Sequence, residues 1–181
     1  MTISNRISRR RLITSAVSAA AIALPNGRLK ADGEKHKIKG DEMTTLTPYL
    51  LFDGHCHQAM DFYQSCFGGE LNVIKVKDSP VKDHMPAIQQ DKVLNARLRH
   101  GNLEISASDW LRPDRTPVRG NTVCLYLRGG TLRELQTLFE KLSDGADVTD
   151  PLQPVFFGSY GALNDKFGVR WMFQSDEKAA A

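Results

Sequence analysis

The chain has 181 residues, 41% hydrophobic and 25% charged, an ordinary globular composition that excludes a collagen-like or wholly disordered protein. No apolar run reaches the roughly 18 residues of a membrane-spanning helix, and three cysteines are too few for a disulfide scaffold. Of the charged side chains, nine basic and four acidic lie in residues 1–42, leaving 15 basic and 17 acidic for the rest. The leader therefore carries a charge of +5 and the rest of the chain −2, so the overall +3 comes from the leader and we expect no nucleic-acid partner. The lack of a long apolar run predicts no stable membrane span.

The leader resembles a twin-arginine export signal. A basic cluster precedes a weakly apolar run at 12–24, which has the length of a signal core and is too short for a comfortable membrane span. Thr14 stands where such signals usually have lysine, and the other key positions match: Arg9, Arg10, Leu12 and Ile13.

This leader predicts a signal segment at 1–31 and, because the following stretch is polar and rich in glycine and lysine, a flexible linker at 32–44. We expect the protein to be exported to a periplasmic or other extracytoplasmic location. The alternative is that translation starts at Met43, which would leave the protein in the cytoplasm.

The first half of the body predicts one helix among strands. A β-favouring run at 46–52 ends in the turn pair Asp53-Gly54. Apolar side chains then recur at helical spacing before Gly68-Gly69, which predicts an amphipathic helix with this stripe: Cys56, Ala59, Met60, Tyr63 and Phe67. The remaining expected elements are a strand at 71–76, a polar loop at 78–92, and a hairpin of strands at 93–99 and 103–107.

The second half repeats this order. A strand at 122–127, with Cys124 inside it, ends at Gly129-Gly130. Thr131 and Glu134 then form a capping-box pattern before a helical stripe of Leu132, Leu135, Leu138, Phe139 and Leu142. Strands are expected at 148–155, 156–163 and 169–173, the first weakened by two prolines.

The repeated order predicts an α+β protein of two βαβββ modules, at about 45–113 and 119–174, within one domain at 45–176. Residues 177–181 are expected to be a disordered tail. Because a single sheet cannot bury its own face, the modules must pack together or exchange between chains. We expect two curved sheets around a cavity, with helices outside.

Three segments, at 47–69, 96–109 and 164–172, resemble the PhnB-like branch of the vicinal oxygen chelate superfamily, which has the glyoxalase/bleomycin-resistance/dihydroxybiphenyl dioxygenase-like fold. The resemblance implies paired βαβββ modules and a homodimer. Members often carry a demethylubiquinone methyltransferase label, which the sequence does not support because it has no Gly-rich strand–loop–helix of the kind that holds a methyl donor.

Catalytic members of the superfamily hold a divalent metal with four side chains. Carried onto this sequence, the ligand positions fall near Pro48, Glu104, Asn121 or Thr122, and Met172, of which only Glu104 suits a hard cation. We therefore predict no metal at that position and no other cofactor. The alternative metal-binding cluster is the triplet His55-Cys56-His57. It lies at a predicted helix start, where side chains two positions apart diverge, so we do not expect both imidazoles to bind one ion.

The cavity-lining candidates are aromatic and small polar residues of the predicted strands. Glu104, if it faces the cavity, would be partly desolvated, which would raise its pKa and make it a candidate catalytic base. Ser106 and Ser108 share its strand face, and Asp109 lies on the other. The predicted ligand-binding residues are Ser106, Ser108, Asp109, Trp110, Tyr126, Tyr160 and Trp171, with core packing as the alternative role for the aromatic ones.

Two functions follow from these features. The first is a binding protein that holds a small molecule, such as an aromatic one, without a metal, in the manner of drug-resistance relatives. The alternative is a metal-dependent lyase, isomerase or dioxygenase with a degenerate metal site, in which Glu104 would matter. A dimeric protein with a purely structural role is the third reading.

Overall fold

Thirteen short elements and the turns between them make up the described part of the chain in the computed structural model, which covers residues 44–112, 114–115, 118, 120 and 122–178. The predicted signal segment, the predicted linker up to residue 43 and tail residues 179–181 lie outside the described residues. The described residues from Thr44 onward belong to one compact unit. None of the described helices is long and apolar enough to cross a membrane.

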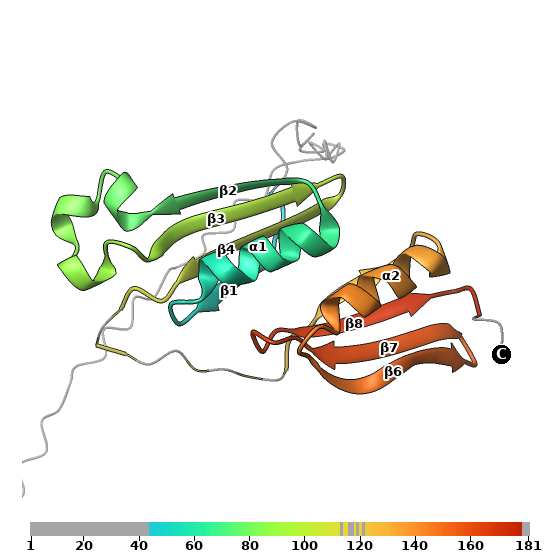
Figure 1. Ribbon diagram of the computed structural model, residues 1–181. Helices are drawn as coiled ribbons and strands as arrows, with labels where there is room; N and C mark the ends of the chain where they lie inside the picture. Colours follow the sequence, from blue (N-terminus) through green and yellow to red (C-terminus); the bar gives the residue numbers. More distant parts are fainter. Residues whose placement is uncertain (1–43, 113, 116–117, 119, 121, 179–181) are drawn as a thin grey trace, which may run out of the picture. The chain divides into compact units, whose positions relative to one another are not determined.

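The first βαβββ module comprises β1 (Tyr49–Phe52), α1 (Cys56–Phe67), β2 (Glu70–Lys75), β3 (Val93–His100) and β4 (Leu103–Asp109). Its four strands form one sheet in the order β1-β4-β3-β2, with β1 parallel to β4 and the other pairs antiparallel. Helix α1 crosses one face of this sheet, drawn in cyan and green in Figure 1. Three short 3₁₀ turns, Val76–Asp78, Lys82–His84 and Ala87–Gln89, occupy the predicted polar loop between β2 and β3.

The second module repeats the first with β5 (Leu125–Arg128), α2 (Leu132–Leu142), β6 (Asp147–Val155), β7 (Gly158–Asn164) and β8 (Arg170–Ser175). The strand order is β5-β8-β7-β6, and β5 is parallel to β8, as β1 is to β4. Figure 1 shows β8, β7 and β6 side by side with α2 on one face. The structure therefore confirms the predicted pair of βαβββ modules. The two prolines of β6 are tolerated because β6 is an edge strand with two register shifts.

Alternation along the strands buries one face of each sheet against its helix. In the first module the helix-facing buried positions include Leu98, Ile105 and Ala107, which join the apolar stripe of α1 in the core. Helix α1 ends at Gly68 and Gly69, whose φ values of 73° and 89° few other residues adopt. Helix α2 begins as predicted, with Thr131 Oγ1 accepting a hydrogen bond from the Glu134 amide at 3.2 Å.

A buried carboxylate joins the two modules. Asp165, in the turn between β7 and β8, accepts hydrogen bonds from the Tyr63 hydroxyl of α1 at 2.7 Å and from the Trp171 indole at 2.8 Å. Its other oxygen accepts the amides of Phe167 and Val169, both at 2.9 Å. Because all four donors converge on one group that is 4% exposed, the turn is fixed against α1.

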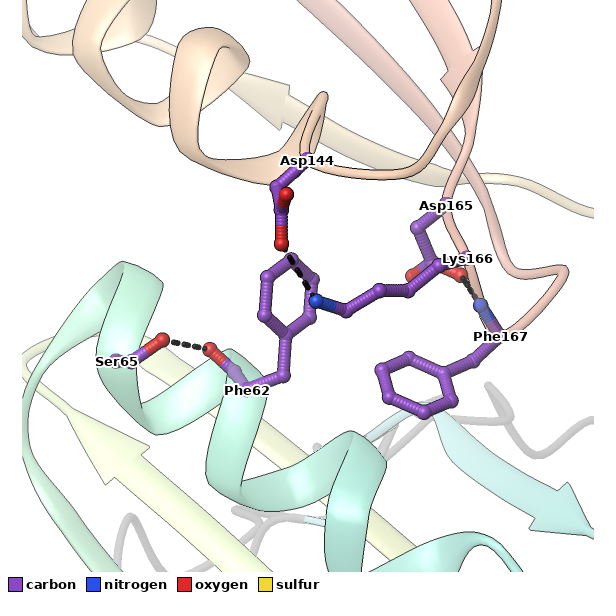
Figure 2. A network of polar contacts seen from close by, with 6 residues as sticks. All are labelled: Phe62, Ser65, Asp144, Asp165, Lys166 and Phe167. Atoms are coloured by element: carbon purple, nitrogen blue, oxygen red, sulfur yellow. Dashed lines mark hydrogen bonds and ion pairs between the residues drawn. The ribbon is translucent and has the colours of Figure 1, made fainter.

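Lys166 extends this junction, as Figure 2 shows. Its ammonium lies 3.9 Å from the centroid of the Phe62 ring and pairs with Asp144 at 2.7 Å. The Phe167 ring lies 5.8 Å from that of Phe62, measured between centroids. The turn after β7 therefore contacts α1 through charge, aromatic packing and hydrogen bonds together.

Two local predictions were wrong. Strand β5 begins at Leu125, so Cys124 lies before the strand, half-buried, with its Sγ 3.0 Å from Met172 Sδ. Phe156 and Phe157 are not in a strand, because the pairing of Val155 with Gly158 leaves them as the two-residue turn between β6 and β7. Phe156 is 92% exposed there.

Candidate functional site

The first sheet presents a largely polar surface on the side away from α1, which we call its helix-distal face. Strand register sets its side chains in rows across the sheet. One row contains Glu70, Arg99 and Glu104, and the next contains Asn72, Arg97, Ser106 and Tyr49. Beyond them lie Ile74 and Asn95, with Ser108 and Leu51 on the neighbouring strands.

Glu104 is the ionic centre of this face. Its Oε2 accepts a hydrogen bond from Arg99 Nε at 2.9 Å, and its Oε1 lies 3.6 Å from Arg97 Nε. The Glu104 side chain is 34% exposed. The sequence predicted the strand face of Glu104 but not the two guanidinium groups that hold its carboxylate.

Ser106 and Ser108 lie beside Glu104 on the same face, as their spacing predicts. They are 8% and 7% exposed. Within the described part of the chain, neither hydroxyl has a hydrogen-bond partner, and the same holds for the side-chain amides of Asn72 and Asn95. The face therefore carries polar groups, from largely buried serines to the exposed Asn72, whose hydrogen-bonding capacity no described residue uses and which remain open to solvent.

A cavity of about 660 Å³ borders this face. Its lining comes from segments 46–48, 102–105 and 123–128, together with Trp171. Most of the lining is apolar, from Leu103, Ile105, Leu125 and Leu127, and Glu104 adds a charged group. The cavity thus combines residues of both modules around the ends of β1, β4 and β5.

Tyr126 and Tyr160 lie on the helix-distal face of the second sheet. Tyr126 is 45% exposed, lines the cavity, and its hydroxyl donates a hydrogen bond to Gln174. Tyr160 is half-buried and pairs in register with Gln174, but it is not among the residues that line the cavity. The structure therefore brings only Tyr126 to the cavity.

The remaining predicted binding residues make contacts within the fold. Asp109 is 4% exposed, and its two oxygens accept the amides of Cys56 and Val93 at 2.9 and 2.8 Å. Trp171 is 1% exposed and lies in the core, although one edge reaches the cavity. Trp110 is half-buried after β4, and its indole N–H donates to the Arg115 carbonyl at 2.8 Å.

The thiols of α1 are buried and unreactive by environment. Burial, with a smaller contribution from Asp109, raises the pKa of Cys56 from 9.0 to about 12. Burial also raises the pKa of the Cys66 thiol. Cys124 is the cysteine that lines the cavity. Neither helix thiol is therefore a candidate nucleophile at neutral pH.

The histidines of the described residues are dispersed. His55 precedes α1, and His57 points along the helix to Asp61, with Nε2 and Oδ1 3.7 Å apart. His100 Nδ1 lies 2.5 Å from the Phe67 carbonyl oxygen. Across the described part of the chain, no three His, Cys, Asp or Glu side chains gather in a group able to hold a metal ion.

Sequence reasoning missed Arg97 and Arg99 as members of the site. Both follow the period-two alternation of a strand that was predicted at 93–99, so a face assignment along that strand would have found them. Asn72 required the register between β2 and β3, which no local pattern provides.

Comparison with known proteins supports the family. The family model described as 3-demethylubiquinone-9 3-methyltransferase matches residues 44–174. Protein YjdN of Escherichia coli K12 is 29% identical over 140 residues, covering 70% of this chain and 92% of that protein.

Solved structures support the same family assignment. Protein PA1353 of Pseudomonas aeruginosa is 33% identical, with a TM-score of 0.67, and the match covers 76% of this chain and all of that one. A PhnB protein of Bacillus cereus is 25% identical, with a TM-score of 0.58 over 73% and 99% of the two chains.

A third structure, a glyoxylase/bleomycin resistance protein/dioxygenase domain from Frankia, shares the fold at 18% identity and a TM-score of 0.50, covering 73% of this chain and 97% of that one. With two βαβββ modules and a family model that spans almost the whole body, the chain belongs to the family described as 3-demethylubiquinone-9 3-methyltransferase, the PhnB-like branch of the vicinal oxygen chelate superfamily.

Proposed function

We propose that the protein binds a small organic molecule in the cavity of about 660 Å³ beside Glu104, without the divalent metal of catalytic superfamily members. The observation that carries this proposal is the lining of the cavity. Small-molecule sites of about 300–1,000 Å³ are mostly apolar with a few polar anchors. Here the leucines of β4 and β5 supply apolar surface, and Glu104 and Tyr126 supply the polar groups.

The donor set at the metal positions does not fit a hard divalent cation. Pro48 has no ligating side chain, and the Glu104 carboxylate is held by two guanidinium groups. Met172 offers a thioether whose sulfur contacts Cys124. Hard cations prefer several oxygen or imidazole ligands, and we therefore base no catalytic step on a metal.

Methyl transfer, which the family's description names, is also not part of the proposal. Each sheet is mixed, with a single parallel pair, β1–β4 or β5–β8. A methyl donor held in a Gly-rich loop usually follows a strand of a doubly wound parallel sheet, and neither sheet of the described residues is of that kind.

Native mass spectrometry of the purified protein, followed by a thermal-shift screen of small aromatic compounds, would test the binding function. We expect a bound compound that raises the melting temperature, and Tyr126→Ala should weaken that shift because Tyr126 lines the cavity. Tyr160→Ala is the matched control, since Tyr160 lies on the same sheet face outside the cavity. Absence of any bound or stabilising compound would contradict the proposal.

Elemental analysis distinguishes the metal-dependent alternative. After reconstitution with Ni²⁺, Zn²⁺, Mn²⁺ and Fe²⁺, we expect metal well below one ion per chain. A stoichiometric ion that is lost in Glu104→Gln would favour a lyase, isomerase or dioxygenase instead.

The homodimer and the export signal stay predictions. Light scattering on the body from Met43 onward would report its oligomeric state. Export would be tested by fusing residues 1–42 to a reporter, where Arg9→Lys combined with Arg10→Lys should retain the reporter inside the cell if the twin arginine is the recognised feature.

A further inference from the structure

The helix-distal face of the first sheet holds hydrogen-bonding groups that the fold does not use. Ser106 and Ser108 are more than nine-tenths buried, yet neither hydroxyl has a partner among the described residues. Among the described residues, the only side-chain oxygen or nitrogen that is both hidden from solvent and unpaired is Gln89 Oε1, so both serine hydroxyls reach the surface of this face. They are therefore open to hydrogen bonds from a ligand, and the charges around the serines indicate its chemistry.

Arg97 is the charged residue in register with Ser106. It occupies the central strand β3, directly opposite Ser106 on one side and Asn72 on the other. In the described part of the chain its guanidinium has a single polar contact, the ion pair with Glu104, and that N–O separation of 3.6 Å exceeds a hydrogen bond. Its five N–H donors are therefore largely free.

The Glu104 carboxylate is shared between Arg97 and Arg99, and its shorter contact is with Arg99. The Arg99 Nε–Glu104 Oε2 distance is 2.9 Å, a charge-assisted hydrogen bond. Glu70 also lies in the Arg99 row, so both carboxylates of this face gather at the end of the sheet near the β3–β4 hairpin. In the described rows that contain Arg97, Asn95 and Ser108, Arg97 is the only charged side chain.

We propose that Arg97 binds an oxyanion of the ligand, a carboxylate or a phosphate group, with the Ser106 hydroxyl and the Asn72 amide as further donors. A planar guanidinium suits two oxygens of one anionic group, and the neighbouring neutral donors complete the set. This inference rests on the proposed small-molecule function and names the ligand class. The cavity and the anion site meet at Glu104, which lines the cavity and contacts Arg97.

A titration with benzoate and its neutral isostere benzamide, followed by amide NMR at constant ionic strength, tests the proposal. We expect benzoate, and not benzamide, to shift the amide resonances of Arg97, Ser106 and Ser108. Arg97→Gln should weaken benzoate binding by about tenfold or more, because it removes a charge-assisted pair. Phenyl phosphate in a parallel titration shows whether a carboxylate or a phosphate is preferred.

Glu104→Gln is the second variant, and it should strengthen benzoate binding because it removes the carboxylate that competes for Arg97. Arg170→Gln, on the second sheet, controls for loss of a positive charge elsewhere and should leave affinity unchanged. Equal benzoate affinity in wild type and Arg97→Gln, or no benzoate-dependent shifts at saturation, would overturn the proposal. If benzamide binds as well as benzoate, the anion site at Arg97 is refuted while small-molecule binding stands. If benzoate binds through Arg97 but no compound in the thermal-shift screen stabilises the protein, the anion site stands and the cavity as a binding site for aromatic compounds is refuted.

Discussion

Asp165 is the residue on which the junction of the modules depends. A carboxylate that accepts four hydrogen bonds in the core is stable only while its donors remain in place. Burial, together with Asp165, raises the pKa of Tyr63 above its ordinary value, so the phenol keeps the proton that it donates. Tyr63 is therefore a permanent donor to this carboxylate.

Replacing Tyr63 with Phe should lower the free energy of unfolding by about 1–3 kcal/mol, because it deletes one donor to a buried carboxylate without changing the packing. Urea unfolding would measure the change. Tyr160→Phe is the control, since the Tyr160 hydroxyl has no hydrogen bond within the described residues. Equal losses in the two variants would show that the Tyr63 hydroxyl carries no special weight.

The buried thiol of Cys56 makes the free energy of unfolding fall as the pH rises through the alkaline range. Its thiol ionises near pH 9.0 in an unfolded chain and, because burial raises its pKa, near 12 in the folded one. Between these values the folded state keeps a proton that the unfolded state has released. The contribution of Cys56 is therefore complete below about pH 9 and is lost as the pH rises toward 12.

In Cys56→Ala, the alkaline fall in the free energy of unfolding should be shallower by up to about 1.4 kcal/mol per pH unit, the value for one proton. Urea unfolding at several pH values above 9 would measure this slope. The matched control is Cys124→Ala, which makes the same replacement at a half-buried position of the cavity wall outside helix α1. An unchanged slope in Cys56→Ala would contradict the assignment.

At the scale of elements, helix α1 is capped from a distance. His55, the residue before the helix, makes no side-chain cap, and the Asp109 carboxylate at the end of β4 accepts the Cys56 amide instead. The second oxygen accepts the first amide of β3. One carboxylate thus aligns a helix start with two strands, and its negative charge suits the positive end of the helix dipole.

Asp109→Asn should destabilise the protein by about 1–3 kcal/mol, because an amide cannot accept from both the Cys56 and Val93 N–H groups in the same geometry. Thermal and urea unfolding would measure the loss. Asp61→Asn on the exposed side of α1 serves as the control and should have little effect, since surface ion pairs contribute little. An unchanged free energy of unfolding in Asp109→Asn would mean that the fold does not need this cap.

The elements that sequence patterns predicted well are those with local signals. The stripe of α1 and the Gly68-Gly69 stop give its bounds, Cys56–Phe67, and Thr131 marks the start of α2. Phe156 and Phe157 were misassigned because aromatic residues favour strands, whereas the β6–β7 register makes them a turn. The capping role of Asp109 was invisible because it joins residues 53 positions apart.

Local patterns likewise predicted some parts of the candidate site and not others. Alternation along β4 predicted that Glu104, Ser106 and Ser108 share a face, which the strand pairing confirms. Alternation along β3 would also have grouped Arg97 with Arg99, but which side chains they face depends on the register of β2, β3 and β4, so Asn72 could not be placed from local patterns. Cavity lining depends on contacts between the modules, which separated Tyr126 from Tyr160.

At the scale of the whole molecule, the two modules share one core. Tyr63 and Phe67 of α1 pack on Trp171 of β8, with ring centroids 5.5 Å apart in both pairs. Aromatic contacts from Phe167 reach Phe52 and Phe62 in the first module. Because neither module buries these side chains alone, we expect the described body to unfold cooperatively.

The two tryptophans allow a test of this cooperativity. Trp110 follows the last strand of the first module, and Trp171 lies in the last strand of the second. In Trp110→Phe and in Trp171→Phe, the remaining fluorescence transition should coincide with the loss of far-UV circular dichroism. Trp171→Phe should have the lower midpoint because it also removes a donor to Asp165. Separated transitions in either variant would show that the modules unfold independently.

The hydroxyls of Ser106 and Ser108, which form no hydrogen bond with any described residue, affect how this protein can be made more stable. A search for more stable variants would favour alanine or valine at these largely buried strand positions, because either change replaces a hydroxyl that no described residue bonds with apolar surface. Such a search, scored by melting temperature alone, would select against the groups that we assign to ligand binding. A thermostable descendant of this chain therefore risks being a better-folded protein with nothing to bind, and stability screens here need a binding readout beside them.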